Sequence, residues 1–329
     1  MKMAILFLTA LVAYSQAPPA STSPSDANLV LIRFQVSQKK GQLVADLRPE
    51  EIEVREDGAA QKIGLFEGGT LSPRTVPTEV IFLFDCERSA LSAGTLSPRV
   101  FHENLLDQQK NVSVSIYGFS GGMVRFAAHT RDEGALKKAM DSGLFVHPLG
   151  TYLLDHIREL ADDAAKSGRA VRMLVVLSDG ESDTGSSLSQ ASKRDQSDAA
   201  VRAAQGANMA LYPVLLKQPF GSQASSGGSD SFARGGGSRG ASGSSSDALR
   251  SIGDFTNLSS ATGGDNFDAL SGSNFLPGLI KSIAKLSQDD YVVGFELHSS
   301  GAVKRHKVEV VLRDKNRGKV VGGTRTLVH

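Results

Sequence analysis

Short apolar runs alternate with amphipathic stretches through the middle of the chain. The apolar runs at residues 80–84 and 173–177 are each followed within two residues by an acidic side chain, and continuous runs of this length are typical of buried strands in a parallel sheet. Residues 151–165 instead carry apolar side chains on one face at helical spacing. Strands and helices that alternate in this way predict a doubly wound, Rossmann-like α/β domain over residues 79–289. Further strands are expected at residues 112–119, 123–128 and 209–216, and further helices at 99–109, 132–140, 196–204, 247–261 and 275–286.

The two ends of the chain show the two-residue period of antiparallel strands. Residues 29–36 and 51–56 alternate, and Asp57 with Gly58 predicts a hairpin turn that has residues 61–66 as its partner strand. After the last helix, three strands without an intervening helix are expected to form a meander. These strands are expected at residues 291–297, 304–312 and 319–327.

Neither terminal β unit is large enough to bury a core alone. We therefore expect residues 29–70 and 290–329 to pack together as a small antiparallel β-sandwich, with the α/β domain inserted between its two halves. Residues 70–78 contain two prolines and are expected to be the linker into that domain. Within the domain, residues 220–246 are dominated by Gly and Ser, which predicts a disordered loop.

Composition narrows the classes of partner. The 329 residues carry a net charge of +1 at pH 7 and include no tryptophan, so neither the basic footprint of a nucleic-acid-binding protein nor a platform for base stacking is expected. Cys86 is the only cysteine, which rules out an intrachain disulfide. Its simplest role is to pack beneath the turn that follows the strand, and a reactive thiol beside the site is the alternative.

The first residues have the pattern of a secretory signal peptide. Lys2 supplies a positive charge, residues 4–12 are apolar, and residues 15–17 (Ser-Gln-Ala) fit a small-x-small cleavage site. The apolar run is too short to span a bilayer. We expect cleavage after residue 17, a flexible leader over residues 18–28, and export to the periplasm or the extracellular space without a membrane span.

Oxygen-bearing side chains follow the two apolar strands and open the amphipathic helix. Asp85 and Ser89 come after the first run, and Asp179 comes after the second. Thr151 stands at the start of the helix. Ligands of open α/β sheets bind outside the carboxyl ends of the strands, so we expect these four side chains to share one rim. A set of oxygen donors predicts a hard divalent cation of the magnesium type.

These residues resemble the metal-ion-dependent adhesion site of a von Willebrand factor type A domain. The family pattern is Asp-x-Ser-x-Ser, then a lone Thr, then an Asp that is usually followed by Gly. Here residues 85–89 read Asp-Cys-Glu-Arg-Ser, Thr151 is the lone threonine, and residues 179–180 read Asp-Gly. The chain departs from the pattern at Glu87, which replaces the middle Ser.

The resemblance implies a metal centre through which the chain binds another protein. Ser89 and Thr151 would bind Mg²⁺, or Mn²⁺ or Ca²⁺ in its place, directly. Asp85 and Asp179 would hold the ion through water, and an acidic side chain of the partner would complete the octahedron. Glu87 would be either an additional direct ligand or a side chain that fills the space and abolishes binding.

The flanks resemble the bacterial von Willebrand factor type A-related proteins that are abundant in Acidobacteria. Residues 41–47 and 51–63 are similar to the leader of that family, and residues 291–295 and 306–310 are similar to its closing strands. This resemblance covers nearly the whole mature chain.

The predicted function is therefore that of an exported, non-enzymatic binding or adhesion protein. The alternative is a scaffold domain of the same fold without metal, in which Asp85 and Asp179 only cap turns and Thr151 only begins its helix. A hydrolase has less support. Residues 236–240 match a nucleophile elbow by letter, but they lie in a Gly/Ser tract rather than between a strand and a helix. The histidines show no zinc-ligand spacing.

Overall fold

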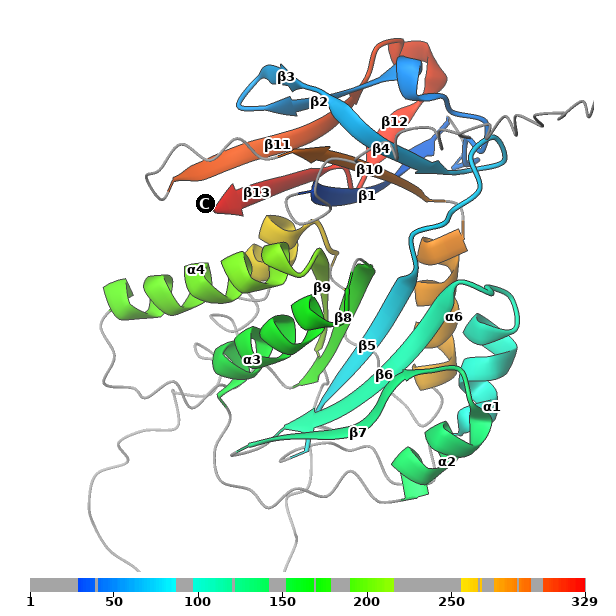
Figure 1. Cartoon of the computed structure of the whole chain (residues 1–329), viewed down its shortest axis with the longest axis vertical. Coiled ribbons are helices and arrows are strands. Elements are labelled where there is room, and N and C mark those ends of the chain that lie inside the picture. Colours follow the sequence, from blue (N-terminus) through cyan, green and yellow to red (C-terminus); the bar gives the residue numbers. More distant parts are fainter. Residues whose placement is uncertain are drawn as a thin grey trace, which may run out of the picture.

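The structure is a computed structural model, and its described strands form three sheets (Figure 1). It describes residues 29–38, 41–86, 97–119, 122–141, 152–168, 170–178, 190–215, 256–265, 267, 275–288, 290–296 and 304–328. The predicted signal peptide, the leader and the Gly/Ser-rich segment lie outside these ranges. No helix among the described residues is long and apolar enough to cross a membrane.

One sheet has five strands in the order β7-β6-β5-β8-β9. The four strands β5, β6, β8 and β9 run parallel, and β7 at the edge runs antiparallel to β6. Every residue of β5 and β8 is buried, as expected for central strands covered on both faces. The bounds are β5 (Thr78–Asp85), β6 (Val112–Phe119), β7 (Met123–Thr130), β8 (Val171–Ser178) and β9 (Met209–Leu215).

Helices cover both faces of this sheet (Figure 1). On one face, alternate residues of β5 such as Phe82 and Phe84 pack against α1 (Pro98–Phe101), the π-helical turn η3 (His102–Leu106), α2 (Glu133–Asp141) and α6 (Phe275–Gln288). On the other face, Ile81 and Leu83 pack against α3 (Leu153–Lys166), α4 (Gln190–Gly206) and a helix at residues 256–262. The predicted α/β class is therefore confirmed.

The other two sheets have four strands each, in the orders β12-β1-β10-β4 and β13-β11-β2-β3. Each sheet combines strands from both ends of the chain in antiparallel pairs, and β1 lies directly beside β10. One hydrophobic cluster, which includes Phe34, Val54, Phe295 and Val310, draws on both sheets. The strands are β1 (Leu29–Ser37), β2 (Ile52–Glu56), β3 (Ala59–Gln61), β4 (Ile63–Gly68), β10 (Tyr291–Glu296), β11 (Arg305–Leu312), β12 (Lys319–Val321) and β13 (Thr324–Val328), with 3-10 turns η2 (Pro49–Glu51) and η4 (Lys315–Arg317).

The predicted C-terminal meander is wrong. The strand β10 pairs with β1 and β4, whereas β11 pairs with β2 and β13 and belongs to the other sheet. The single strand expected at residues 319–327 is two strands, β12 and β13, which lie in different sheets. The chain crosses at Gly322 and Gly323, where a Cβ on Gly323 would lie 2.5 Å from Cγ1 of Val320. A side chain at residue 323 would therefore have to displace the side chain of Val320 in β12.

The N-terminal hairpin is confirmed in part. Asp57 and Gly58 form the turn between β2 and β3, and both have positive φ angles. The hairpin partner ends at Gln61, however, and residues 63–68 form β4 in the other sheet instead of extending the hairpin. Alternation specifies which face of a strand is apolar, but it does not specify which strand lies next to it.

Tyr291 of β10 is the centre of the core between these sheets. Its ring stacks on Phe34 and Phe66 with centroid separations of 5.5 Å each. Its hydroxyl donates to the carbonyl of Val44 at 3.0 Å and accepts from the amide of Leu47 at 3.0 Å. One hydroxyl therefore serves two backbone groups of the segment between β1 and β2.

We expect Tyr291→Phe to lower the free energy of unfolding by about 1–3 kcal/mol, because it leaves a buried N–H and C=O without a partner. Burial raises the pKa of Tyr291, so its contribution to stability is complete below the unfolded value of about 10 and is lost as the pH rises through the folded value. Urea unfolding at pH 7 and above pH 10 measures both effects. Between pH 7 and a pH above 10, Tyr291→Phe should lose less free energy of unfolding than the wild type. Tyr152→Phe, at an exposed tyrosine, should behave like the wild type.

A buried ion-pair group connects β1 to α6 and to the segment that precedes β5. Asp290, just before β10, accepts from Nε of Arg33 in β1, and its Oδ1 lies 2.6 Å from Nη2 of Arg74. The Arg74 contact is an ion pair without hydrogen-bond geometry. Arg33 also donates through Nη2 to the carbonyl of Leu286 in α6 at 2.9 Å. One carboxylate thus holds two arginines from separate segments.

Candidate metal centre

The carboxyl ends of β5 and β8 lie side by side. The two strands pair in parallel up to Phe84 opposite Leu177, so Asp85 and Ser178 are the last residues of neighbouring strands. Each is about 1% exposed. The Ser178 hydroxyl donates to Oδ2 of Asp85 at 2.7 Å. This hydrogen bond directly joins the two strand ends at which the sequence predicts metal ligands.

The start of α3 packs close to the same edge. Asp85 pairs with Phe119, the last residue of β6, and the Phe119 ring lies 5.6 Å from the ring of His156. His156 is in the first turns of α3, and Leu153, the first residue of that helix, packs in the same hydrophobic cluster as Phe119. Thr151 is two positions before Leu153 in the chain. Asp85, Ser178 and the start of α3, which are the described neighbours of the predicted site, therefore lie toward one edge of the sheet.

Of the predicted site residues, Asp85 is the one that the structure describes. Glu87, Ser89, Thr151 and Asp179 lie outside the described residues. Their immediate neighbours Cys86, Tyr152 and Ser178 are described. Within the described ranges, no group of three or more His, Cys, Asp and Glu side chains gathers as a metal site would. The predicted ligand set stays a prediction.

The groups that are described at this edge fit a hard cation. Both carry oxygen atoms, a carboxylate at Asp85 and a hydroxyl at Ser178. Magnesium is commonly held by one or two carboxylates together with water, and a ligating carboxylate is usually oriented by a further hydrogen bond. Ser178 provides such a bond to Asp85. The sequence interpretation assigned no role to Ser178, although a hydroxyl at the last position of an apolar strand is a signal that could have identified it.

Cys86 packs against the core. It is partly buried against the cluster that contains Phe82 and Phe84, and its Sγ lies 3.5 Å from the carbonyl oxygen of Phe84. A Cβ placed on Gly118 of the next strand would come within 2.6 Å of that sulfur. These contacts agree with the packing role that is the simpler expectation for this cysteine.

A second buried polar group lies at the opposite, amino-terminal edge of the sheet. Glu79 accepts from the Ser115 hydroxyl at 2.6 Å, and its carboxylate lies 3.1 Å from Nδ1 of His129 and 3.3 Å from Nε of Arg172. Ser, His and an acid also make hydrolase triads, but there the hydroxyl is bonded to the imidazole base. Here Ser115 donates to the carboxylate, so the group is an ion-pair network. This network was not predicted from the sequence. The signal that could have identified it is Glu79, an acidic residue directly before the apolar run at residues 80–84.

No protein-family model matches the chain, and no curated protein is detectably similar to it. Solved structures with some likeness include an aerotolerance-related membrane protein from Bacteroides fragilis (17% identity, 63% of this chain, 98% of that chain, TM-score 0.39). Another is BatB, a conserved hypothetical protein from Bacteroides thetaiotaomicron (18% identity, 64% and 98%, TM-score 0.39).

A third is the von Willebrand factor domain of the type V pili tip protein Mfa5 from Porphyromonas gingivalis (16% identity, 36% of this chain, 44% of that chain, TM-score 0.29). It is from the family that the sequence resembles. At TM-scores below 0.5 these likenesses define neither the fold nor the function of the chain, and the α/β class stands on the sheet described above. The chain is thus an α/β protein whose sequence resembles von Willebrand factor type A-related proteins.

Proposed function

We propose that the chain is an exported, non-enzymatic protein that binds another protein through a divalent cation at the carboxyl edge of the five-stranded sheet. The cation is Mg²⁺, with Mn²⁺ or Ca²⁺ as substitutes. The partner contributes an acidic side chain to the open coordination position. The observation that carries the proposal is the hydrogen bond from Ser178 to Asp85, which connects two of the predicted ligand segments at their strand ends.

The proposal gives each residue of the predicted set a role. Ser89 and Thr151 bind the metal directly through their hydroxyl oxygens. Asp85 and Asp179 hold metal-bound water and balance the charge of the ion. Glu87 supplies one more carboxylate oxygen, which makes this site more anionic than one with serine at the same position. When bound, the cation supplies the positive charge that draws in the carboxylate of a partner.

A second candidate, a scaffold of the same fold without metal, has one observation in its favour. The Asp85 carboxylate already accepts a hydrogen bond from Ser178, which offsets part of the cost of its burial without an ion. In such a scaffold the partner would be recognised by surface shape alone. The two candidates differ in one measurable property, which is the affinity of the purified protein for Mg²⁺ or Mn²⁺.

Calorimetric titration with MgCl₂ or MnCl₂ is expected to show saturable binding to the wild-type protein. Thr151→Ala and Ser89→Ala should weaken the affinity at least tenfold, because the loss of groups that only support a ligand already costs about 10–100-fold. Ser178→Ala should weaken it by a smaller factor, since it removes the bond that orients Asp85. Wild-type protein that binds neither ion would refute the metal proposal and favour the scaffold.

Two further variants sharpen the titration. Ser282→Ala removes a hydroxyl from the exposed face of α6, where it bonds to the carbonyl of Gly278, and should leave metal affinity unchanged. Glu87→Ser restores the family residue. It should lower the affinity if Glu87 is a ligand, as proposed, and raise it if Glu87 blocks the site.

We also propose a domain organisation, which the strand pairings support. Residues 29–70 and 290–329 form one β-sandwich, and residues 79–289 form the inserted α/β domain. The pairing of β1 with β10 and of β2 with β11 supports this division, because each pair joins the two ends of the chain.

Export through residues 1–17 is tested by N-terminal sequencing of the secreted product, which should begin at residue 18.

A further inference from the structure

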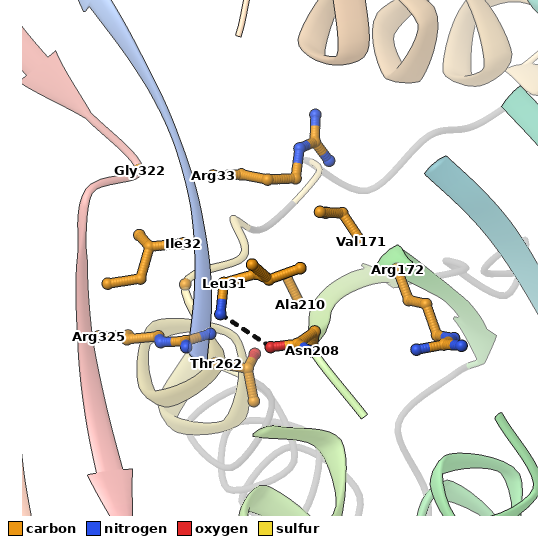
Figure 2. Close-up of a pocket in the computed structure, with 11 residues that line it drawn as sticks. Leu31, Ile32, Arg33, Val171, Arg172, Asn208, Ala210, Thr262, Gly322 and Arg325 are labelled. Carbon is orange, nitrogen blue, oxygen red and sulfur yellow. Dashed lines mark hydrogen bonds between the residues drawn. The ribbon is translucent and has the colours of Figure 1, made fainter. Parts of the chain in front are cut away.

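A small cavity lies between the sandwich strands and the α/β domain (Figure 2). Its volume is about 10 Å³, roughly the space that one water molecule needs. Residues of β1, β8 and β9 line it together with the turn after the helix at 256–262 and the crossing between β12 and β13. Strands of all three sheets therefore border it.

Arg325 of β13 lines this cavity and forms no ion pair with any residue that the structure describes. The residue is only 4% exposed, and neither Nε nor Nη2 has a hydrogen-bond partner. Figure 2 shows its guanidinium extending behind β1 toward Asn208 and Thr262. Two strong donors of a buried cation thus lie at the cavity without an acceptor.

The charges around the cavity are all of one sign. Arg33 and Arg172 also line it, but their guanidinium groups are paired elsewhere, with Asp290 and Glu79 respectively. No carboxylate is among the lining residues. Burial lowers the pKa of Arg325 to about 9, and no neighbouring acid raises it. An unpaired charge in such a place is unfavourable, so a negative partner would stabilise the protein.

Of the other polar side chains of the lining, Asn208 offers a donor and Thr262 is engaged elsewhere. The Asn208 Oδ1 already accepts from the amide of Leu31 at 2.9 Å, which leaves the amide nitrogen of that side chain as a donor. The Thr262 hydroxyl is engaged with the carbonyl of Leu258 and the amide of Leu211. A ligand that accepts several hydrogen bonds and donates none suits this lining.

We propose that the cavity is a binding site for a monatomic anion, chloride, held by Nε and Nη2 of Arg325. A water molecule would accept the same hydrogen bonds, but it would leave the charge of the guanidinium uncompensated. Phosphate, sulfate and carboxylates exceed the available volume. The site is separate from the proposed metal centre, and it connects the sandwich to the α/β domain through one ion.

A crystal of the wild-type protein soaked in sodium bromide tests the site directly. Bromide replaces chloride and gives an anomalous signal, and we expect a peak within hydrogen-bonding distance of Nε and Nη2 of Arg325. A map with bromide peaks only at surface positions and an ordinary water beside Arg325 would overturn the proposal. Because this test uses the unchanged protein, it does not depend on whether any variant folds.

Thermal unfolding gives the test in solution. At constant ionic strength, replacing gluconate by chloride should raise the melting temperature. A chloride concentration ten times its dissociation constant raises the ratio of folded to unfolded protein roughly tenfold. Arg325→Met should abolish this response to chloride. Arg305→Met, at an exposed arginine of β11, should keep it. An equal chloride response of the wild type and Arg325→Met, or no response of the wild type, would contradict the proposal.

Discussion

Replacing Asp290 by Asn is expected to lower the free energy of unfolding by about 3–5 kcal/mol, the cost of removing one partner from a buried ion pair. The side chains of Arg33, Arg74 and Asp290 are 8%, 10% and 3% exposed, so water screens them little. Asparagine removes the only negative charge of the group, and its amide nitrogen would face guanidinium donors. Most domains are stable by only about 5–15 kcal/mol, so the loss is a large part of the total.

Urea unfolding at pH 7 measures the effect of Asp290→Asn. Asp141→Asn is the matched control, because Asp141 pairs with Lys137 on an exposed surface of α2 and should contribute little. Addition of Arg74→Met to Asp290→Asn should restore part of the lost stability, since it removes one of the two uncompensated charges. A loss for Asp290→Asn no larger than that for Asp141→Asn would contradict the buried ion-pair description.

Gly264→Ala is expected to have the second large effect. A Cβ at this position would lie 1.7 Å from the carbonyl oxygen and 2.6 Å from the carbonyl carbon of Leu211 in β9. Both are backbone atoms of a central sheet, so the clash cannot be relieved by turning a side chain. We expect a loss of about 3 kcal/mol, at the upper end of the cost of overpacking a core, or failure to fold.

Thermal unfolding and soluble yield measure this loss. Gly278→Ala in α6 is the control, because its Cβ meets nothing within 4 Å and alanine favours a helix by about 0.5–1 kcal/mol over glycine. The same substitution should therefore stabilise at one site and destabilise at the other. Equal effects at both positions would show that the turn at Gly264 moves away from β9.

The α/β part of the fold could be predicted from local pattern because its elements are long and strongly periodic. The runs that became β5 and β8 are apolar throughout, and a strand with no polar face must be covered on both sides. The helix at residues 256–262 ends at a pair of glycines, where Gly263 has a φ of +79° and the amide of Gly264 bonds to the carbonyl of Ser259, as in a Schellman helix end.

The partners of the short terminal strands could not be predicted from the sequence. Six of the eight strands have at most six residues, and their alternation is compatible with several neighbours. Long-range packing makes the choice, above all the ring of Tyr291 between Phe34 and Phe66. A meander is the simplest connection of three consecutive strands, but here the connection from β10 to β11 passes from one sheet to the other.

The candidate sites differ in how visible they are in the sequence. Asp85 is visible because an acid that ends an apolar strand lies at a sheet edge, and the structure places it there. Arg325 is not visible, since an arginine between two threonines in a short strand has the pattern of a solvent-facing position. Only the packing of β13 against the α/β domain buries it. Sequence patterns therefore identify side chains at element ends better than side chains at contacts between distant segments.

The strands β4 and β10 are antiparallel neighbours, although the whole α/β part of the chain lies between them in the sequence. Gly68, at the end of β4, lies opposite Tyr291, at the start of β10, so the entry and the exit of the intervening segment are adjacent. Adjacent antiparallel strands can be joined by a two-residue turn. The two ends of the intervening segment therefore lie at one point, where a short turn could join β4 directly to β10.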